Sequence, residues 1–202
     1  MKKMPLIDTN LISRYIPNKI ENLSGIPAAV LIPIVITSNA PQILFTVRSR
    51  NVSYGEHVSF PGGGYDPADG DLASTALRET REETGICAKQ VEIIGRIDDF
   101  MSTKGHIVSP FVGFVKTNGS FPATNVSTEV SRIFMSPLED LLDPVIETGQ
   151  RRCLRSPSYI YMIDNTEIWG LTASILTQFI DILYKGVSVR PVCRIIEAGS
   201  FS

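Results

Sequence analysis

The sequence predicts an α+β fold, or a β-sheet sandwiched between helices, for most of this 202-residue chain. β-branched apolar runs at 28–36, 43–47 and 107–115 have the length and composition of β-strands. Two other segments, 70–84 and 168–183, place apolar side chains at helical spacing. Because strands and helices mix without a regular strand–helix alternation, a doubly wound parallel sheet is not expected.

The first two strands are expected to pair. The runs 28–36 and 43–47 are separated by a turn-forming segment at 38–41. Later strands are expected at 91–97, 107–115, 132–135 and 159–163, with a short helical turn at 138–142. The chain is therefore divided into an N-terminal extension packed on the domain (1–25), the domain itself (26–186) and a C-terminal tail (187–202).

The first long helix has a clear start and end in the sequence. Asp69 or Asp71 can cap its first turn, and Gly85 can end it. The side chains expected on its inward face are Leu72, Ala73, Ala76 and Leu77.

The last helix is expected to begin at Ile168 and to end at Gly186. Its buried face is expected at Ile168, Leu171, Ile175, Phe179 and Leu183. Trp169 is interpreted as a core residue. His57 is interpreted as structural or exposed.

Composition and charge favour a globular protein that binds neither nucleic acid nor membranes. The formal net charge is −2 and no dense basic stripe is present, so electrostatics do not favour nucleic-acid binding. The apolar segment 168–183 is interrupted by two polar residues and is shorter than the ~20 residues that a membrane helix needs. Because Cys87, Cys153 and Cys193 lack paired ligand spacing, reduced thiols in a cytoplasmic enzyme are expected.

Three glutamates on the first long helix are the strongest indication of function. Glu79, Glu82 and Glu83 are spaced i, i+3, i+4, so they lie on one helical face. Like charges so placed cost roughly 0.2–0.5 kcal/mol per pair in an isolated helix. A divalent cation would convert that repulsion into attraction, because Mg²⁺ is held by carboxylates together with phosphate oxygens. The spacing therefore predicts a metal site for phosphate chemistry, although three glutamates alone are also typical of a solvated helix face.

A glycine-rich segment, Phe60–Gly64, precedes this helix. Glycine allows backbone conformations closed to other residues and lets the main chain approach a ligand closely. Gly63 and Gly64 are therefore candidate substrate-binding positions. Without the helix that follows, the same segment would be equally typical of a plain turn.

Together these residues resemble the signature of the Nudix hydrolase family. The second half of that signature is matched by Arg78-Glu79-Thr80-Arg81-Glu82-Glu83-Thr84-Gly85-Ile86, with Thr80 at a usually apolar position, and Gly64 matches the first glycine. Gly70 occupies the place of the first glutamate, but Asp69 and Asp71 flank it and can offer a carboxylate from a shifted register. The resemblance implies an α/β/α sandwich, the Nudix fold, with a mixed β-sheet between helices.

A narrower resemblance, over roughly residues 43–183, is to the coenzyme A diphosphatase branch of that family. It is carried by segments such as 58–63, 95–100, 108–113 and 168–173. The segment 50–57 departs from the branch, because it is one residue shorter and lacks an arginine and a glycine.

The resemblance implies a hydrolase that cleaves the diphosphate of coenzyme A or its thioesters to adenosine 3′,5′-bisphosphate and (acyl)phosphopantetheine. The departure at 50–57 leaves open ADP-ribose or another nucleoside diphosphate derivative as the substrate. The missing glutamate at Gly70 leaves open a catalytically idle binding module. The resemblance also suggests a homodimer.

The same resemblance implies roles for individual residues. Glu79 and Glu83 would be the principal ligands of Mg²⁺ or Mn²⁺, and Glu82 a further ligand or the group that activates water. A backbone carbonyl of Gly62 or Gly63 could complete the metal coordination. Arg78, one helical step away from the acidic face, is expected to pair with a neighbouring glutamate and to orient it.

Three further residues are candidates for contact with substrate or water. Glu129 matches an acidic residue that can assist water activation in the branch, but it is equally consistent with a loop carboxylate. Arg48 and Arg50 are candidate phosphate contacts, since guanidinium groups match phosphate geometry, and ordinary surface charge is the alternative for both.

Overall fold

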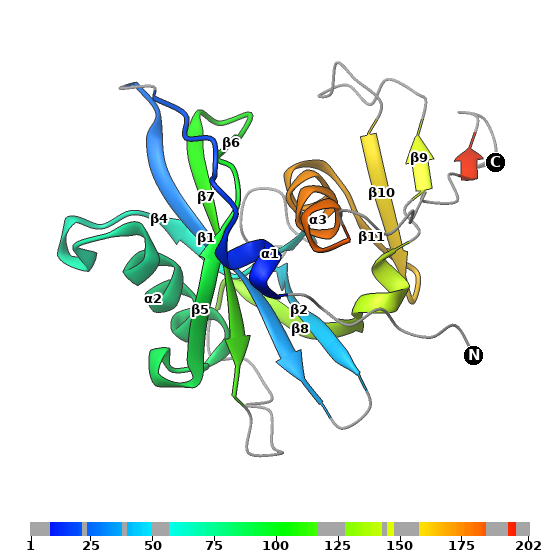
Figure 1. Ribbon diagram of the computed structural model, residues 1–202, viewed down its shortest axis with the longest axis horizontal. Coiled ribbons are helices and arrows are strands. Elements are labelled where there is room, and N and C mark those ends of the chain that lie inside the picture. Colours follow the sequence, from blue (N-terminus) through cyan, green and yellow to red (C-terminus); the bar gives the residue numbers. More distant parts are fainter. Residues whose placement is uncertain are drawn as a thin grey trace.

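A mixed β-sheet lies between two layers of helices in the computed structural model (Figure 1). The structure describes residues 9–21, 24–37, 40–49, 57–116, 128–142, 145–147, 158–184 and 194–196. One helix covers one face of the sheet, and two cover the other. These are α2 (Leu72–Thr84) on one side and α1 (Thr9–Ser13) with α3 (Gly170–Leu183) on the other. The α/β/α sandwich expected from the sequence is thus confirmed.

The main sheet has the order β3-β2-β1-β7-β5, with β4 paired to β1, β6 to β7 and β8 to β2. Its strands are β1 (Ile26–Ile36), β2 (Pro41–Arg48), β3 (Val58–Ser59), β4 (Gly62–Gly64), β5 (Val91–Arg96), β6 (Phe100–Met101), β7 (His106–Val115) and β8 (Val130–Pro137). The long β1–β7 pair is parallel and the other pairs are antiparallel, which makes the sheet mixed.

Smaller elements complete the described part of the chain. A second sheet has the order β11-β10-β9-β12 and contains β9 (Val145–Glu147), β10 (Ser158–Ile163), β11 (Thr166–Ile168) and β12 (Arg194–Ile196). Three 3₁₀ turns are η1 (Pro67–Asp69), η2 (Ala88–Gln90) and η3 (Leu138–Leu141). No helix among the residues that the structure describes has the length and apolarity to cross a membrane.

Strand β1 is apolar along most of its length because both of its faces are covered. Successive side chains of a strand point to opposite faces. Ile32 and Ile34 belong to the large core cluster that includes Phe179 of α3. Ala29 and Leu31 instead cluster with Ala76 of α2. The run therefore reads as continuously hydrophobic, as is usual for a strand buried on both sides.

The glycine-rich segment fills a gap at one edge of β1. This edge pairs with β4 at residues 28–30 and with β2 at residues 34–36, while β7 occupies the opposite edge. Between the two pairings, the Leu31 N–H donates to the Pro61 carbonyl at 2.9 Å. Since β3 pairs with β2, the segment 58–64 crosses from β2 to β1 and passes beneath α2. The fold thereby places the glycines next to the acidic helix.

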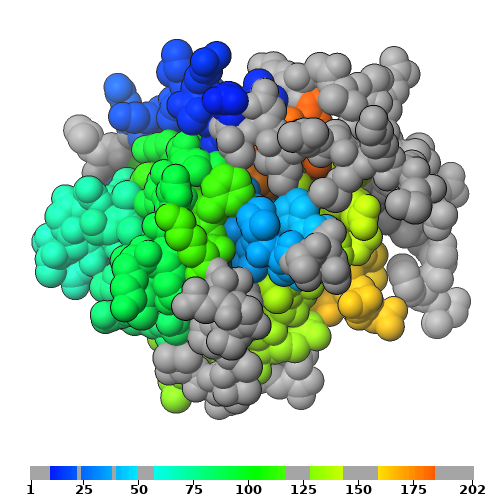
Figure 2. Space-filling view, turned by 60° about the horizontal axis from the view of Figure 1, so that its bottom comes forward, coloured from blue at the N-terminus to red at the C-terminus, as the bar shows by residue number. Residues whose placement is uncertain are grey.

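Residues 9–21 pack against the domain. Ile12 of α1 is buried in the large core cluster. Asp98 accepts hydrogen bonds from the Tyr15 hydroxyl at 2.9 Å and from Gln178 Nε2 of α3 at 2.7 Å. Asp99 accepts a bond from the Ile20 N–H at 3.0 Å. In Figure 2 this N-terminal stretch (blue) lies against the strands coloured green. Asp98 and Asp99 therefore hold this segment in place.

The buried face of α2 differs from the expected one. Its buried residues are Thr75, Ala76, Thr80, Glu83 and Thr84, whereas Ala73 and Leu77 are only half-buried. Threonines tolerate this face because their hydroxyls bond back to the helix: Thr80 donates to the Ala76 carbonyl and Thr84 to the Thr80 carbonyl, each at 2.6 Å. The expectation was correct for Ala76 and for Leu72, which packs against the same cluster, and wrong for Ala73 and Leu77. An apolar count does not register threonines whose hydroxyls are satisfied within the helix.

The last helix also begins later than expected. Ile168 lies in β11, and α3 starts at Gly170, whose φ of +64° allows a sharp change of direction from strand to helix. The interior positions Ile175, Phe179 and Leu183 are buried as expected. The expected end at Gly186 and the tail at 187–202, apart from β12 (Arg194–Ile196), lie outside the described residues.

Candidate active site

Helix α2 carries the candidate metal-binding carboxylates, and its two ends have well-formed caps. Asp71 is the N-cap residue, and its side chain accepts a hydrogen bond from the Ser74 N–H at 2.7 Å. Gly85 ends the helix in the left-handed conformation, with φ of +76°. Of the two aspartates that could cap the start, Asp71 is the one that does so.

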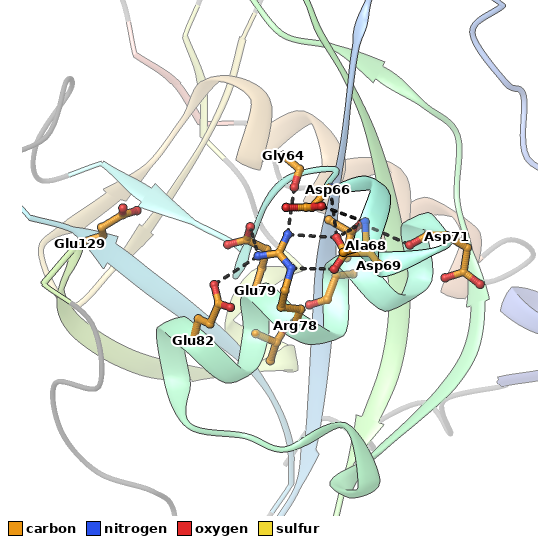
Figure 3. A network of polar contacts seen from close by, with 12 residues as sticks. Gly64, Asp66, Ala68, Asp69, Asp71, Arg78, Glu79, Glu82 and Glu129 are labelled. Atoms are coloured by element: carbon orange, nitrogen blue, oxygen red, sulfur yellow. Dashed lines mark hydrogen bonds and ion pairs between the residues drawn. The ribbon is translucent and has the colours of Figure 1, made fainter.

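The three glutamates share a helical face but experience different environments. Glu83 is buried, Glu79 is half-buried and Glu82 is exposed. Within the part of the chain that the structure describes, no three His, Cys, Asp or Glu side chains converge into a ready-made ion site. Glu79 and Glu82 both turn towards Arg78 (Figure 3).

Glu83 is held under the glycine segment. The Thr46 hydroxyl of β2 donates to Glu83 Oε2 at 3.5 Å, and the Gly62 N–H also bonds to this carboxylate. Burial raises the pKa of Glu83 to about 7, even though the positive charge of Arg48 acts in the opposite direction. A positive charge beside this carboxyl group favours its ionised form, whereas burial disfavours it. No pattern in the sequence links Thr46 to Glu83, because the contact joins residues 37 positions apart in the chain.

Two glycines are required by the closeness of their surroundings. A β-carbon at Gly62 would lie 2.3 Å from the Ala29 carbonyl oxygen, and Gly62 also has a φ of +156°. A β-carbon at Gly63 would lie 2.5 Å from both Cδ and Oε1 of Glu79. Real β-carbons do not approach other atoms so closely. The glycine segment therefore forms a surface on which the Glu79 carboxylate rests.

Arg78 connects the acidic face to the loop before the helix (Figure 3). Its Nη1 donates to Glu79 Oε1 at 2.7 Å and to Glu82 Oε2 at 3.2 Å. Its Nε donates to Asp69 Oδ1 at 2.7 Å, and its Nη2 donates to Asp69 Oδ2 and to the Gly64 carbonyl, both at 3.1 Å. The expected pairing of Arg78 with neighbouring glutamates is thus present, and a third carboxylate joins it.

Arg48 and Glu129 form an ion pair that stands apart from this network. Arg48 Nη2 lies 3.6 Å from Glu129 Oε2 at the end of β2, and the Ser49 N–H donates to the Glu129 carbonyl at 2.7 Å. Arg48 Nε is buried and has no hydrogen-bond partner among the residues that the structure describes. The structure therefore brings two predicted site residues together, and the charges of both act on the Glu83 carboxyl group. Arg50 lies outside the described residues.

The NUDIX domain family model matches residues 26–156, which include the glycine segment, α2 and Glu129. The chain belongs to the Nudix hydrolase family.

Curated relatives carry the same family name. A protein of Photorhabdus laumondii named Uncharacterized Nudix hydrolase NudL is 36% identical over 159 residues, covering 75% of this chain and 81% of the relative. The protein of the same name from Yersinia pestis is 37% identical over 153 residues, covering 74% of this chain and 75% of the relative. The NUDIX domain of Shewanella oneidensis NrtR, crystallised with ADP-ribose, superposes with a TM-score of 0.52 at 16% identity. That superposition covers 90% of this chain and 99% of the NrtR domain, and it supports the fold alone.

Sequence reasoning missed one contact at the edge of this Nudix site. His57 lies edge-on to Trp169, with ring centroids 4.7 Å apart, and its carbonyl accepts from the Arg48 N–H at 3.0 Å. Burial, together with the charge of Arg48, lowers the pKa of His57. Trp169 is half-buried at the N-cap of α3, so its assignment to the core was wrong. Helical spacing suggested the core, but Trp169 precedes the helix.

Proposed function

We propose that this Nudix hydrolase cleaves the diphosphate of coenzyme A or its thioesters, using Mg²⁺ or Mn²⁺. The products would be adenosine 3′,5′-bisphosphate and phosphopantetheine or its acyl derivative. The observation that carries the proposal is the packing of α2 against the glycine strand, which sets the carboxylate of Glu79 directly over Gly63. This arrangement brings a carboxylate of the helix against the backbone of the strand, so that carboxylate and carbonyl oxygens lie close together.

The donor groups match a hard divalent cation. Glu79, Glu82 and Glu83 offer carboxylate oxygens, and Gly62 or Gly63 can add a backbone carbonyl. Burial raises the pKa of Glu83 to about 7, against the opposing effect of the positive charge of Arg48. Because ligands bind metals in their deprotonated form, a bound ion would replace the proton of Glu83 and recover the cost of its burial.

The chemistry is the attack of water on a phosphorus atom of the diphosphate. A bound divalent ion neutralises phosphate charge and lowers the pKa of water. As the new oxygen–phosphorus bond forms, the anhydride bond breaks, and the proton of water passes to a carboxylate. Glu82, which is exposed on the acidic face, and Glu129, which lies beside Arg48, are the two candidates for that carboxylate. Arg48 would contact a phosphate oxygen through its guanidinium group.

Coenzyme A is favoured as the substrate by the resemblance of segments that surround the site. The segment 58–63, which resembles the coenzyme A diphosphatase branch, is the one that crosses between β2 and β1 under α2. The departure from the branch at 50–57 supports the alternative of a different nucleoside diphosphate derivative. ADP-ribose is a suitable comparison substrate, since the NrtR domain was crystallised with it.

A parallel assay tests the proposal. The purified chain would be incubated with Mg²⁺ or Mn²⁺ and with coenzyme A, ADP-ribose or ATP, and the phosphorylated products identified. We expect turnover of coenzyme A to exceed that of the other two. A preference for ADP-ribose or ATP would contradict coenzyme A as the substrate but would support the same metal-dependent hydrolysis. Inactivity towards all three compounds would favour an idle binding module and contradict the proposal.

Substitution of Glu83 tests the site itself. Glu83→Gln removes a ligand charge while keeping the size of the side chain, and we expect kcat to fall by about a hundredfold, which corresponds to about 2.7 kcal/mol of activation free energy. Glu92→Gln is the matched control, because Glu92 is an exposed residue of β5 that pairs with Lys116 at 3.1 Å. Unchanged turnover in Glu83→Gln would remove Glu83 from the site.

A further inference from the structure

Arg78 uses the two edges of its guanidinium group for different purposes. Nε and Nη2 both donate to Asp69, at 2.7 and 3.1 Å, which is a two-point contact between a guanidinium and a carboxylate. Nη1 faces the opposite way and reaches Glu79 and Glu82 (Figure 3). The direction in which Arg78 presents Nη1 to the acidic face is therefore set from the Asp69 side.

Asp69 is itself firmly placed. Its Oδ2 accepts hydrogen bonds from the Thr75 hydroxyl at 2.8 Å and from the Asp66 N–H at 3.2 Å. Its side chain is 6% exposed. The hydrogen bonds from Arg78 hold the pKa of Asp69 well below its usual range, so the carboxylate is charged at neutral pH. Asp69 can therefore act as a rigid support for Arg78.

The backbone explains why this carboxylate comes from residue 69. Gly70 ends η1 with a φ of +78°, a conformation that side-chain-bearing residues rarely adopt. A glutamate at position 70, where the family signature has one, would be strained in this turn. Asp71 is occupied as the N-cap of α2, with its side chain on the Ser74 N–H. Asp69 is the remaining neighbour, and it alone of the two aspartates contacts Arg78.

We infer that Asp69 is a positioning residue which, by holding Arg78, sets the Glu79 and Glu82 carboxylates for a divalent cation. The inference rests on the proposed function. Without Asp69, the charge of Arg78 would be balanced only by Glu79 and Glu82. Arg78 would then compete with an incoming cation for those carboxylates, because both positive charges are attracted to the same oxygens. Asp69 offsets that competition while keeping Arg78 in place.

Manganese binding in the absence of substrate tests this inference. The full chain and its variants would be titrated with Mn²⁺ while the free ion is followed by electron paramagnetic resonance. We expect Asp69→Asn to weaken Mn²⁺ binding by about tenfold or more, the usual effect of losing a group that orients a metal ligand. Asp71→Asn is the matched control, because it removes the same charge two residues away and asparagine caps a helix as well as aspartate does. We expect its affinity to stay within about twofold of wild type.

A second variant tests the inference if Asp69→Asn does not fold. Thr75→Val removes the hydroxyl that holds Asp69 but leaves every charge in place, and we expect a loss of Mn²⁺ affinity of about threefold. Thermal unfolding of each variant would show which ones are folded.

Three results would overturn the inference. Wild-type affinity in Asp69→Asn, or in Thr75→Val if Asp69→Asn does not fold, would show that Asp69 does not position the site. Equal losses in Asp69→Asn and Asp71→Asn would show that only local charge matters. A wild-type chain that takes up no Mn²⁺ would overturn the proposed function and this inference together, whereas the first two results leave the proposed function intact.

Discussion

The absence of a side chain at Gly63 allows the Glu79 carboxylate to lie against the backbone of β4. The Glu79 carboxylate lies where a side chain at position 63 would otherwise begin, with only 2.5 Å between its Cδ and an added β-carbon. Gly64, the next residue of β4, has open space around the same position. The requirement for glycine at 63 is therefore steric and directly concerns a candidate metal ligand.

Substituting alanine at Gly63 and at Gly64 should show whether the close contact with Glu79 at position 63 matters for metal binding. In Gly63→Ala the β-carbon must displace the Glu79 carboxylate, which can move because it ends a flexible side chain. We expect the protein to remain folded and its affinity for Mn²⁺ to fall by about tenfold. Gly64→Ala should retain wild-type affinity, because its β-carbon meets nothing within 4 Å. Equal Mn²⁺ affinities in the two variants would contradict the proposed position of Glu79 at the metal.

Helix α2 illustrates how an element can be buried through polar residues. Its inner face carries Ala76 and the threonines whose hydroxyls return to helix carbonyls, and it packs on β1 around Ala29 and Leu31. Thr80 occupies a position that is usually apolar in the family signature, yet it is fully buried. Its hydroxyl is satisfied within the helix, so only its methyl group must be accommodated by the sheet.

Larger side chains at two alanines of this helix would show which face is buried. Ala76 is completely inaccessible, so Ala76→Leu would overpack the contact with β1 and should lower the free energy of unfolding by about 1–3 kcal/mol. Ala73 is half-buried, and Ala73→Leu should change the free energy of unfolding by no more than about 0.5 kcal/mol. Chemical denaturation measures both. Similar losses would mean that the helix is rotated from the described orientation.

On the scale of the whole molecule, Asp98 connects three segments that are distant in sequence. It accepts hydrogen bonds from the Tyr15 hydroxyl, from the backbone and side chain of Asn18, and from Gln178 of α3. Burial raises the pKa of Asp98, but these hydrogen bonds outweigh it and hold the pKa below its usual range. The carboxylate is thus stabilised by its partners, and its contribution to folding is present above pH ~4 and declines as the solution becomes more acidic.

Removal of this carboxylate should release the N-terminal segment. In Asp98→Ala, the donors of Tyr15, Asn18 and Gln178 lose their acceptor, and we expect a loss of about 1–3 kcal/mol in unfolding free energy. Amide hydrogen exchange of residues 9–21 should accelerate, while that of β1 should change little. The control is Glu139→Ala, an exposed residue of η3. If residues 9–21 kept wild-type protection in Asp98→Ala, Asp98 would not be what holds them.

Much of the fold could be predicted from local patterns. The strands at 28–36, 43–47 and 107–115 and the helix ending at Gly85 lie where the sequence indicates, because side-chain periodicity and helix caps depend on neighbouring residues. The parallel pairing of β1 with β7 could not be read in this way, since it joins segments about 80 residues apart. The start of α3 was misplaced because Ile168 has the right spacing for the helix but belongs to β11.

The sequence by itself determined the acidic face, the glycine segment before it and the membership of the Nudix family, since each depends on residues close together in the chain. Only the tertiary structure decided that Glu83 is buried beside Thr46, that Asp69 and not Asp71 holds Arg78, and that Arg48 meets Glu129. The physical reason is that the partner of a charged side chain depends on distances and burial in three dimensions. Spacing along one helix or strand predicts which side chains share a face, but it does not predict which residue of another element lies opposite them.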